Sequence, residues 1–337
     1  MGWISMFLDK VVGVPPTDWT LLDDLPDPGL GIAGKPVVAD QCYVELYVES
    51  LRLEKARRFA TSFHGVIYAF ASLARTGANR AQLASVTKPQ NLASLDKNNL
   101  GRVITVSKRI MGAIPWRGDP LGLELGLFSV KSGNLLSPLI DYVAKISDKA
   151  GISVVTKLDP FLPLITEGLD MIAGQTQDTE IELAIDTDLS LTGSRFCALI
   201  ARPKGTISSS GVTIDKADRK LLQNGQPLEA AYCLFSIRST DRNADWGTIP
   251  ALQGAFAEFT RAVLSGRHRD AEEALAAFNR QVVVSPDLIS TDKDRLKSKA
   301  KADLQDAFPG GGQAMPLQGA RLRFENRTLA DLNLYDH

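Results

Sequence analysis

Residues 42–53, CYVELYVESLRL, carry the pattern that decides the predicted fold. Val44, Leu46 and Val48 alternate with Glu45 and Glu49, which is the period of a β-strand with one buried and one polar face. Runs of similar character recur along the chain and give about seven strands of ordinary length. The predicted strands are 42–53, 66–74, 102–107, 121–130, 180–188, 195–203 and 230–239.

The order of these strands favours antiparallel pairing. Helices are not interleaved with successive strands, as they would be in a parallel sheet built from strand–helix–strand units. The polar connection within residues 75–101 is expected to be a surface loop. We therefore predict an α+β fold, with an antiparallel β-sandwich of about seven strands, an inserted helical pair and a helical C-terminal region.

The inserted helical pair is predicted within residues 135–174, LLSPLIDYVAKISDKAGISVVTKLDPFLPLITEGLDMIAG. Apolar residues recur there at intervals of three and four, and charged residues such as Lys145 and Glu167 fall on the other side of each helix. The charges leave no run long enough to span a bilayer. The segment is interpreted as core packed on the sheet. The alternatives are membrane insertion after a conformational change and a wall of an apolar ligand pocket.

The sequence divides into four regions. A Pro-, Gly- and Asp-rich lead-in over residues 1–41 is expected to be extended. The β-sandwich is placed at residues 42–240, with the helical insertion at 134–174. Helical periodicity takes over at residues 249–308, and residues 309–337 are expected to form a linker and tail.

The charge balance and the cysteines restrict the classes of partner and compartment. The chain has 38 Lys and Arg residues against 39 Asp and Glu, so no overall field attracts nucleic acid or an anionic membrane. No basic segment precedes the first apolar run, and the three cysteines have no CxxC spacing. These features predict a soluble, cytoplasmic protein with reduced thiols, and nucleic acid is not expected as a partner.

The sequence offers little catalytic chemistry. Three histidines occur, and none belongs to a hydrolase, nucleotide-binding or metalloprotease motif. His64 is expected to be an ordinary turn residue and His268 a solvated one. No cofactor is predicted. The pattern favours a protein that is not an enzyme, although a hydrolase with a dispersed active site would leave no linear motif.

Four aspartates make the candidate metal site. Asp186 and Asp188 end one predicted strand, and Asp241 and Asp245 follow another. A β-sandwich can bring such strand ends together, and calcium accepts about six to eight oxygen ligands in flexible geometry. The sequence therefore suggests a calcium site, with aspartates that only solvate the ends of loops as the alternative.

Trp116 and Arg117 form the candidate interaction site, in a Gly- and Pro-rich approach to a strand. An exposed Trp–Arg pair would suit a binding hot spot, whereas Trp116 packed over the edge of the core is the alternative.

The function predicted from these observations is that of a non-enzymatic interaction or assembly protein that acts through its surfaces. A protein partner or self-assembly is expected. A membrane-active or lipid-binding protein that uses residues 135–174 is the second interpretation, and a hydrolase with dispersed catalytic residues is the third.

Overall fold

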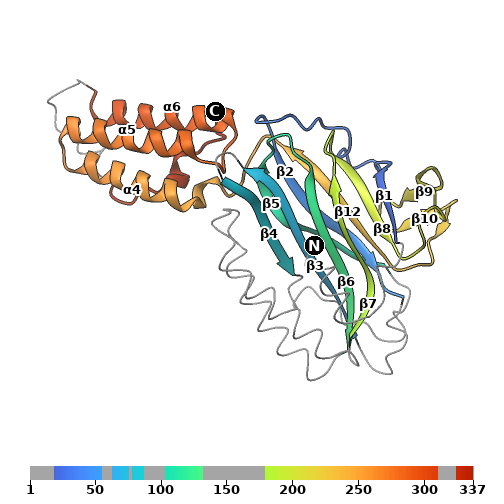
Figure 1. Ribbon diagram of the computed structural model, residues 1–337. Helices are drawn as coiled ribbons and strands as arrows, with labels where there is room; N and C mark the ends of the chain where they lie inside the picture. The colour runs from blue at the N-terminus through green and yellow to red at the C-terminus, as the bar shows by residue number, and fades with distance from the viewer. Residues whose placement is uncertain are drawn as a thin grey trace.

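The computed structural model describes residues 19–54, 63–75, 78–86, 103–131, 179–309 and 324–336 of the chain. These parts form three antiparallel sheets and three long helices (Figure 1). The helices lie at one end of the largest sheet, and the smallest sheet, which contains β9 and β10, lies toward the other end.

The largest sheet has five strands, and every neighbouring pair in it is antiparallel. Alternation along β2 turns Val44, Leu46 and Val48 to one face, because successive side chains of a strand point to opposite sides, and all three are buried. In order across the sheet, the strands are β1 (Thr20–Leu25), β8 (Arg195–Ile200), β12 (Tyr232–Thr240), β2 (Tyr43–Arg52) and β5 (Ile104–Pro115).

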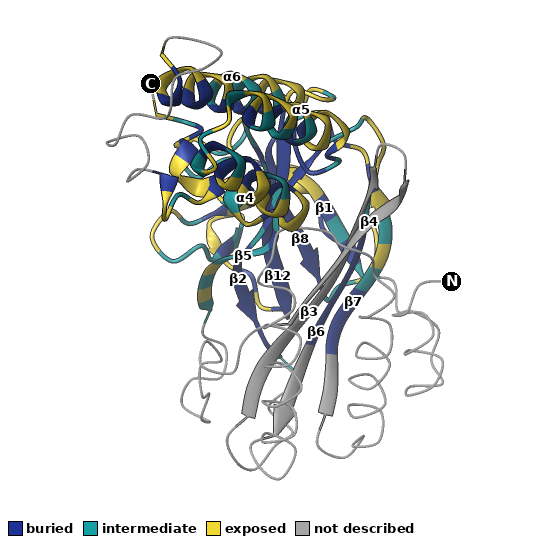
Figure 2. Cartoon of the chain, turned by 90° about the vertical axis from the view of Figure 1, so that its left-hand side faces the viewer, coloured by how far each residue is buried: buried dark blue, intermediate teal, exposed yellow. Residues whose placement is uncertain are grey.

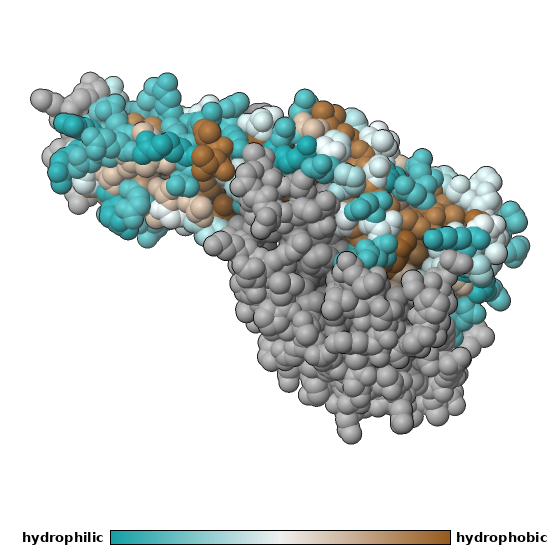
Figure 3. Space-filling view, in the orientation of Figure 1, coloured by the Kyte–Doolittle hydropathy of each residue, from teal (hydrophilic) through white to brown (hydrophobic). Residues whose placement is uncertain are grey.

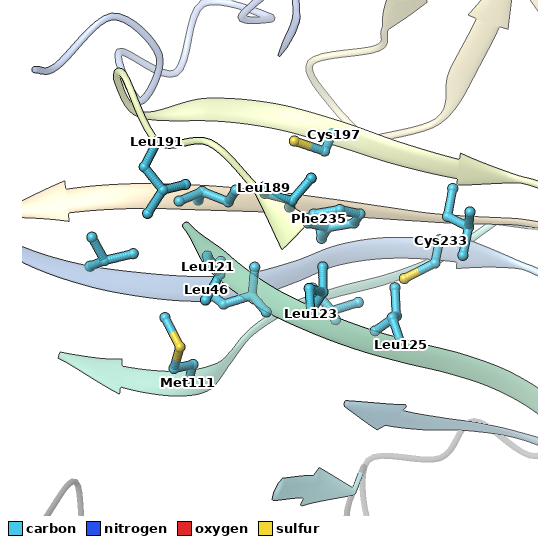
Figure 4. Close-up of a cluster of buried hydrophobic side chains, with 14 of the residues drawn as sticks. Leu46, Met111, Leu121, Leu123, Leu125, Leu189, Leu191, Cys197, Cys233 and Phe235 are labelled. Atoms are coloured by element: carbon cyan, nitrogen blue, oxygen red, sulfur yellow. The ribbon is translucent and has the colours of Figure 1, made fainter. Parts of the chain in front are cut away.

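A four-stranded antiparallel sheet packs against that apolar face. Leu121, Leu123 and Leu125 follow the two-residue period of β6 and share one core with residues of the larger sheet. Figure 4 shows Leu123 and Leu125 beside Phe235 and Cys233. In order across this sheet, the strands are β4 (Ala78–Val86), β3 (Phe63–Arg75), β6 (Leu121–Lys131) and β7 (Thr179–Leu189).

Strand β8 is buried on both faces, which explains its continuous apolar run. Cys197 and Leu199 belong to the core shared with β6, whereas Phe196 and Ala198 pack with the third sheet. Asn224, with φ of 51°, begins the two-residue turn of that sheet, and Asn-Gly at such a turn favours a tight hairpin. The strands of the third sheet are β11 (Gln226–Pro227), β10 (Leu221–Gln223) and β9 (Val212–Ile214).

Residues 246–309 and 324–336 have a core of their own, and we call them the helical unit. The Phe256 and Phe278 rings lie 5.5 Å apart, edge to face, and join α4 to α5. Figure 2 shows exposed residues on the outer faces of these helices and buried ones inside. The helices are α4 (Pro250–Leu264), α5 (His268–Val284) and α6 (Ser290–Ala307).

The prediction of mixed helices and antiparallel sheets is confirmed. A sandwich of seven strands is not confirmed, because the described residues hold twelve strands in three sheets. The helical pair predicted at 134–174 lies outside the described residues. No helix among the described residues is long and apolar enough to cross a membrane.

Two segments that the sequence analysis did not assign to strands contain them. The surface loop predicted within residues 75–101 is wrong for 78–86, which form β4 and pair with β3. The sequence ANRAQLASV is poor in aromatic and β-branched residues, so the neighbouring strand rather than local propensity determines its conformation. Within the lead-in predicted for residues 1–41, β1 joins the five-stranded sheet beside β8.

A buried carboxylate joins the five-stranded sheet to the helical unit. Asp292 lies in the first turn of α6 and is fully buried. The Tyr43 hydroxyl of β2 donates a hydrogen bond of 2.6 Å to its Oδ2, and the Tyr335 hydroxyl donates one of 2.7 Å to the same oxygen. Arg295 donates to Oδ1 at 3.0 Å. We call these four residues the junction cluster.

Two arginines reinforce this connection around the junction cluster. Arg109 of β5 bonds Asp245, which precedes α4, at 2.7 Å. Arg117 pairs with Asp40 and donates to the carbonyl oxygens of Pro286 and Leu288, at 3.3 and 3.2 Å. Residues far apart in the chain are therefore held together by bonds from charged donors, which are stronger than neutral ones.

Replacing Asp292 by alanine is expected to destabilise the protein by about 3 kcal/mol. The change leaves the buried Tyr43 hydroxyl without its acceptor, at about 1–3 kcal/mol for an unsatisfied buried group. The Tyr335 hydroxyl keeps only the longer bond of 3.4 Å to the Asn243 carbonyl. Asp294→Ala is the matched control, because the Asp294 side chain is 74% exposed and its pair with Lys297 is worth at most about 1 kcal/mol. Urea unfolding of both variants measures the difference, and equal small losses would contradict the structural role of Asp292.

Alkaline pH is expected to weaken the fold through Tyr43. Burial, together with the Asp292 carboxylate, raises the pKa of this phenol far above its ordinary value. The unfolded chain then loses the Tyr43 proton near pH 10 while the folded chain keeps it, so stability is full below pH 10 and falls above it. Through Tyr43, the free energy of unfolding falls by about 1.4 kcal/mol for each pH unit above pH 10, and Tyr43→Phe removes this dependence.

Unfolding free energies of wild type and Tyr43→Phe, measured in urea at several pH values above pH 9, provide the test of this effect. The wild-type free energy should fall more steeply than that of the variant above pH 10. Parallel curves for the two proteins would show that Tyr43 does not keep its proton in the fold.

Candidate functional site

A groove between α5 and α6 is the candidate functional site, and we call it the α5–α6 groove. It has a volume of about 1000 Å³, at the upper end of the range of ligand sites. Both walls follow helical spacing, because each lining position on a helix has another one three or four residues away. The α5 wall comprises His268, Glu272, Leu275, Ala276 and Asn279; the α6 wall comprises Asp294, Lys297, Ser298, Lys301, Leu304 and Gln305, followed by Phe308 and Pro309.

The packing of the two helices explains why space remains between them. The inner stripe of α5, which includes Phe278, is used in the core against α4. The positions that face the α5–α6 groove come from the edge of that stripe, and two of them, Ala276 and Ser298, have short side chains. Short side chains on both walls leave the volume unfilled.

The floor of the groove is apolar and ordered. Leu275, Leu304 and Phe308 are buried beneath it. The His268 ring packs edge to face on Phe308, with ring centroids 5.0 Å apart, and its Nδ1 lies 3.5 Å from Glu272. With a side chain only 18% exposed, His268 is not the solvated residue that its charged sequence context predicts.

Charges line the rim unevenly. Lys297 pairs with Asp294 at 2.8 Å. Lys301 is exposed and has no ion-pair or hydrogen-bond partner among the described residues. The α6 wall therefore carries a cation that is available to a ligand, and Glu272 on the α5 wall carries the opposite charge.

One polar atom in the groove has no partner. The Oδ1 atom of Asn279 is buried and accepts no hydrogen bond from the described residues. A buried acceptor without a donor costs about 1–3 kcal/mol, so most such groups in native proteins are paired. Because Asn279 lines the groove, a turn of its amide would present this oxygen to a ligand that donates a hydrogen bond.

The structure separates the aspartates of the calcium hypothesis. Asp186 and Asp188 lie within β7 of the four-stranded sheet, not in a loop after a strand, whereas Asp241 and Asp245 follow β12 of the larger sheet. No group of three or more His, Cys, Asp and Glu among the described residues could hold a metal ion. The four aspartates therefore form no common metal site.

The structure places Trp116 and Arg117 beside the junction cluster. Trp116 is partly buried against the sheet core, and its Nε1 donates to the Asp119 carbonyl at 2.9 Å. The Arg117 side chain is 11% exposed and bonds within the chain to Asp40 and to two carbonyl groups. An interaction role for this pair stays a prediction.

The sequence analysis did not identify the α5–α6 groove. One usable signal was Asn279, a polar residue four positions after Leu275 at the edge of an apolar stripe. Comparisons with protein-family models, with curated proteins and with solved structures find no match. The groove is therefore interpreted from its own chemistry.

Replacing Asn279 by leucine is expected to raise the stability of the free protein by about 1 kcal/mol. The substitution removes the unpaired acceptor and inserts a side chain of similar size that favours a helix. Chemical denaturation measures the change, with Arg280→Leu at the neighbouring exposed position as the control for helix propensity alone. A loss of stability in Asn279→Leu would mean that the amide is satisfied.

Proposed function

We propose that this is a non-enzymatic interaction protein and that the α5–α6 groove binds its protein partner. The observation that carries the proposal is the buried, unpaired Asn279 oxygen in a groove with an apolar floor and a charged rim. Protein recognition sites combine an apolar centre with a polar rim and a few polar groups that fix orientation.

The ionisable groups on the outer face of the five-stranded sheet support the non-enzymatic part of this proposal. Glu49 pairs with Arg238 at 2.6 Å, and Glu45 pairs with Arg109 at 3.0 Å. Arg238 also lies over the Tyr47 ring, 3.7 Å from its centroid. These groups are satisfied by one another, which gives them a role in holding the sheet.

A cytoplasmic location is part of this proposal, and the state of the three cysteines supports it. Cys42, Cys197 and Cys233 are all free and buried. Burial raises the pKa of the Cys197 and Cys233 thiols to about 12, so both stay protonated and unreactive at neutral pH. The membrane-active interpretation depends on residues 135–174, which lie outside the described residues, and it stays a prediction. The hydrolase with a dispersed active site also stays a prediction.

A photo-crosslinking residue, benzoylphenylalanine, placed at Ala276 tests the proposed function. Ala276 lines the groove, whereas Glu273 is exposed on α5 outside it and provides the control position. After irradiation of cell extract of the source organism, a defined adduct is expected from position 276 and not from position 273. Mass spectrometry identifies the adduct, and one of twice the chain mass would reveal self-assembly.

The same adducts from both positions would show nonspecific contact and would contradict the proposal. Absence of any adduct at position 276, with a correctly folded protein, would also contradict it. Circular dichroism of both labelled proteins establishes the folded state before irradiation.

A further inference from the structure

The two walls of the α5–α6 groove carry opposite charges at the end where α5 begins, with Glu272 on one wall and Lys301 on the other. On the α6 wall, Lys297 and Lys301 are one helical turn apart, and only Lys297 has an acidic partner. On the α5 wall, Glu272 is 58% exposed beside His268. A ligand that lies along the groove therefore meets positive charge on one side and negative charge on the other.

The length of the groove also constrains its occupant. The α5 wall runs from His268 to Asn279, about 16 Å at the rise of an α-helix. This is the length of about three helical turns. Since the floor is apolar and the lining positions repeat every three or four residues, the groove has the form that receives an amphipathic helix.

Asn279 places a polar side chain at one end of the α5–α6 groove. His268 packs against Phe308, which follows α6, so the beginning of α5 lies beside the end of α6 and the helices run antiparallel. Asn279 consequently lies at the end of the groove where the α6 wall begins. Its unpaired oxygen is buried, so a donor on a ligand reaches it when the amide turns toward this end of the groove.

We infer that the α5–α6 groove binds an amphipathic helix of about three turns from a partner protein. The helix presents an apolar stripe to the floor, an acidic flank to the α6 wall and a hydrogen-bond donor to Asn279. Reversing the direction of such a helix exchanges its two flanks, so the opposed walls and the single acceptor together fix its orientation. This inference rests on the proposed function and specifies the chemistry of the partner.

Synthetic peptides provide the probe. The first is a helix-prone peptide of about 14 residues with leucines at i, i+4 and i+7, glutamates along one flank and a terminal glutamine toward Asn279. The second has lysines in place of the glutamates. Fluorescence anisotropy with the full-length protein should show the acidic peptide binding about fivefold more tightly, the scale of one solvent-exposed ion pair.

Lys301→Glu should reverse this preference, so that the basic peptide binds more tightly. Lys299→Glu is the matched control: Lys299 lies on the same helix, but its Nζ donates to the Asp336 carbonyl, and it does not line the groove. Ala276→Trp, which fills the groove, should abolish binding of both peptides, and Glu273→Trp should leave it unchanged. Asn279→Leu should weaken both peptides, because both carry the glutamine, and should not affect a version in which alanine replaces that glutamine.

Four outcomes would overturn the inference. Binding that survives Ala276→Trp would place the peptide elsewhere. Equal binding of both peptides to wild type and to Lys301→Glu would remove the electrostatic argument. Failure of both peptides to bind, with capture of phosphatidylglycerol vesicles that is lost in Ala276→Trp, would assign the groove to lipid. A crosslinked partner at position 276 without peptide binding would reject the helix but retain the groove as an interaction site.

Discussion

The buried carboxylate of Asp292 is the constraint on which the arrangement of the sheets and helices depends. It lies where β2, α6 and the C-terminal segment meet, and each contributes a group to it: Tyr43, Arg295 and Tyr335. An ionised carboxylate is costly to bury without such partners. All three segments must therefore be in place together before the charge is satisfied.

The junction cluster has this importance because the apolar cores on its two sides are separate. One core lies between the larger two sheets, and the other lies inside the helical unit. Among the residues that the structure describes, a small apolar cluster of Tyr43, Ala113 and Ile289 connects them. Directional bonds from Tyr43 and Arg117 therefore fix the angle between the units, since apolar contact alone is not directional.

The sequence predicted those strands in which the pattern of buried residues is regular. In β2 and β6, apolar residues recur at every second position, which is the period of a strand. The structure has strands at Tyr43–Arg52 and Leu121–Lys131. Strand β8 was also recognisable, because a strand buried on both faces is a continuous apolar run. Strand β4 was missed because only pairing with β3 makes its sequence extended.

The candidate site was less predictable because it depends on distances between elements. Nothing local in the sequence pairs Arg117 with carbonyl groups about 170 residues away, so its bonds to Pro286 and Leu288 could not be predicted. His268 likewise lies among charged residues in sequence, yet its ring packs on Phe308 after the next helix. Only the inner stripes of α5 and α6 were recognisable from periodicity, and a groove is formed by the positions beside those stripes.

Helix α6 connects the junction cluster to the α5–α6 groove. Asp292 anchors its first turn, and residues of its later turns, including Lys301 and Leu304, form one wall. The other wall is held by α5, whose Phe278 ring is fixed against Phe256. Both walls are therefore held by contacts within the chain, which would lower the conformational entropy lost on the proposed binding. The bonds of Asp292 thus orient α6, and with it the α6 wall, relative to the sheet.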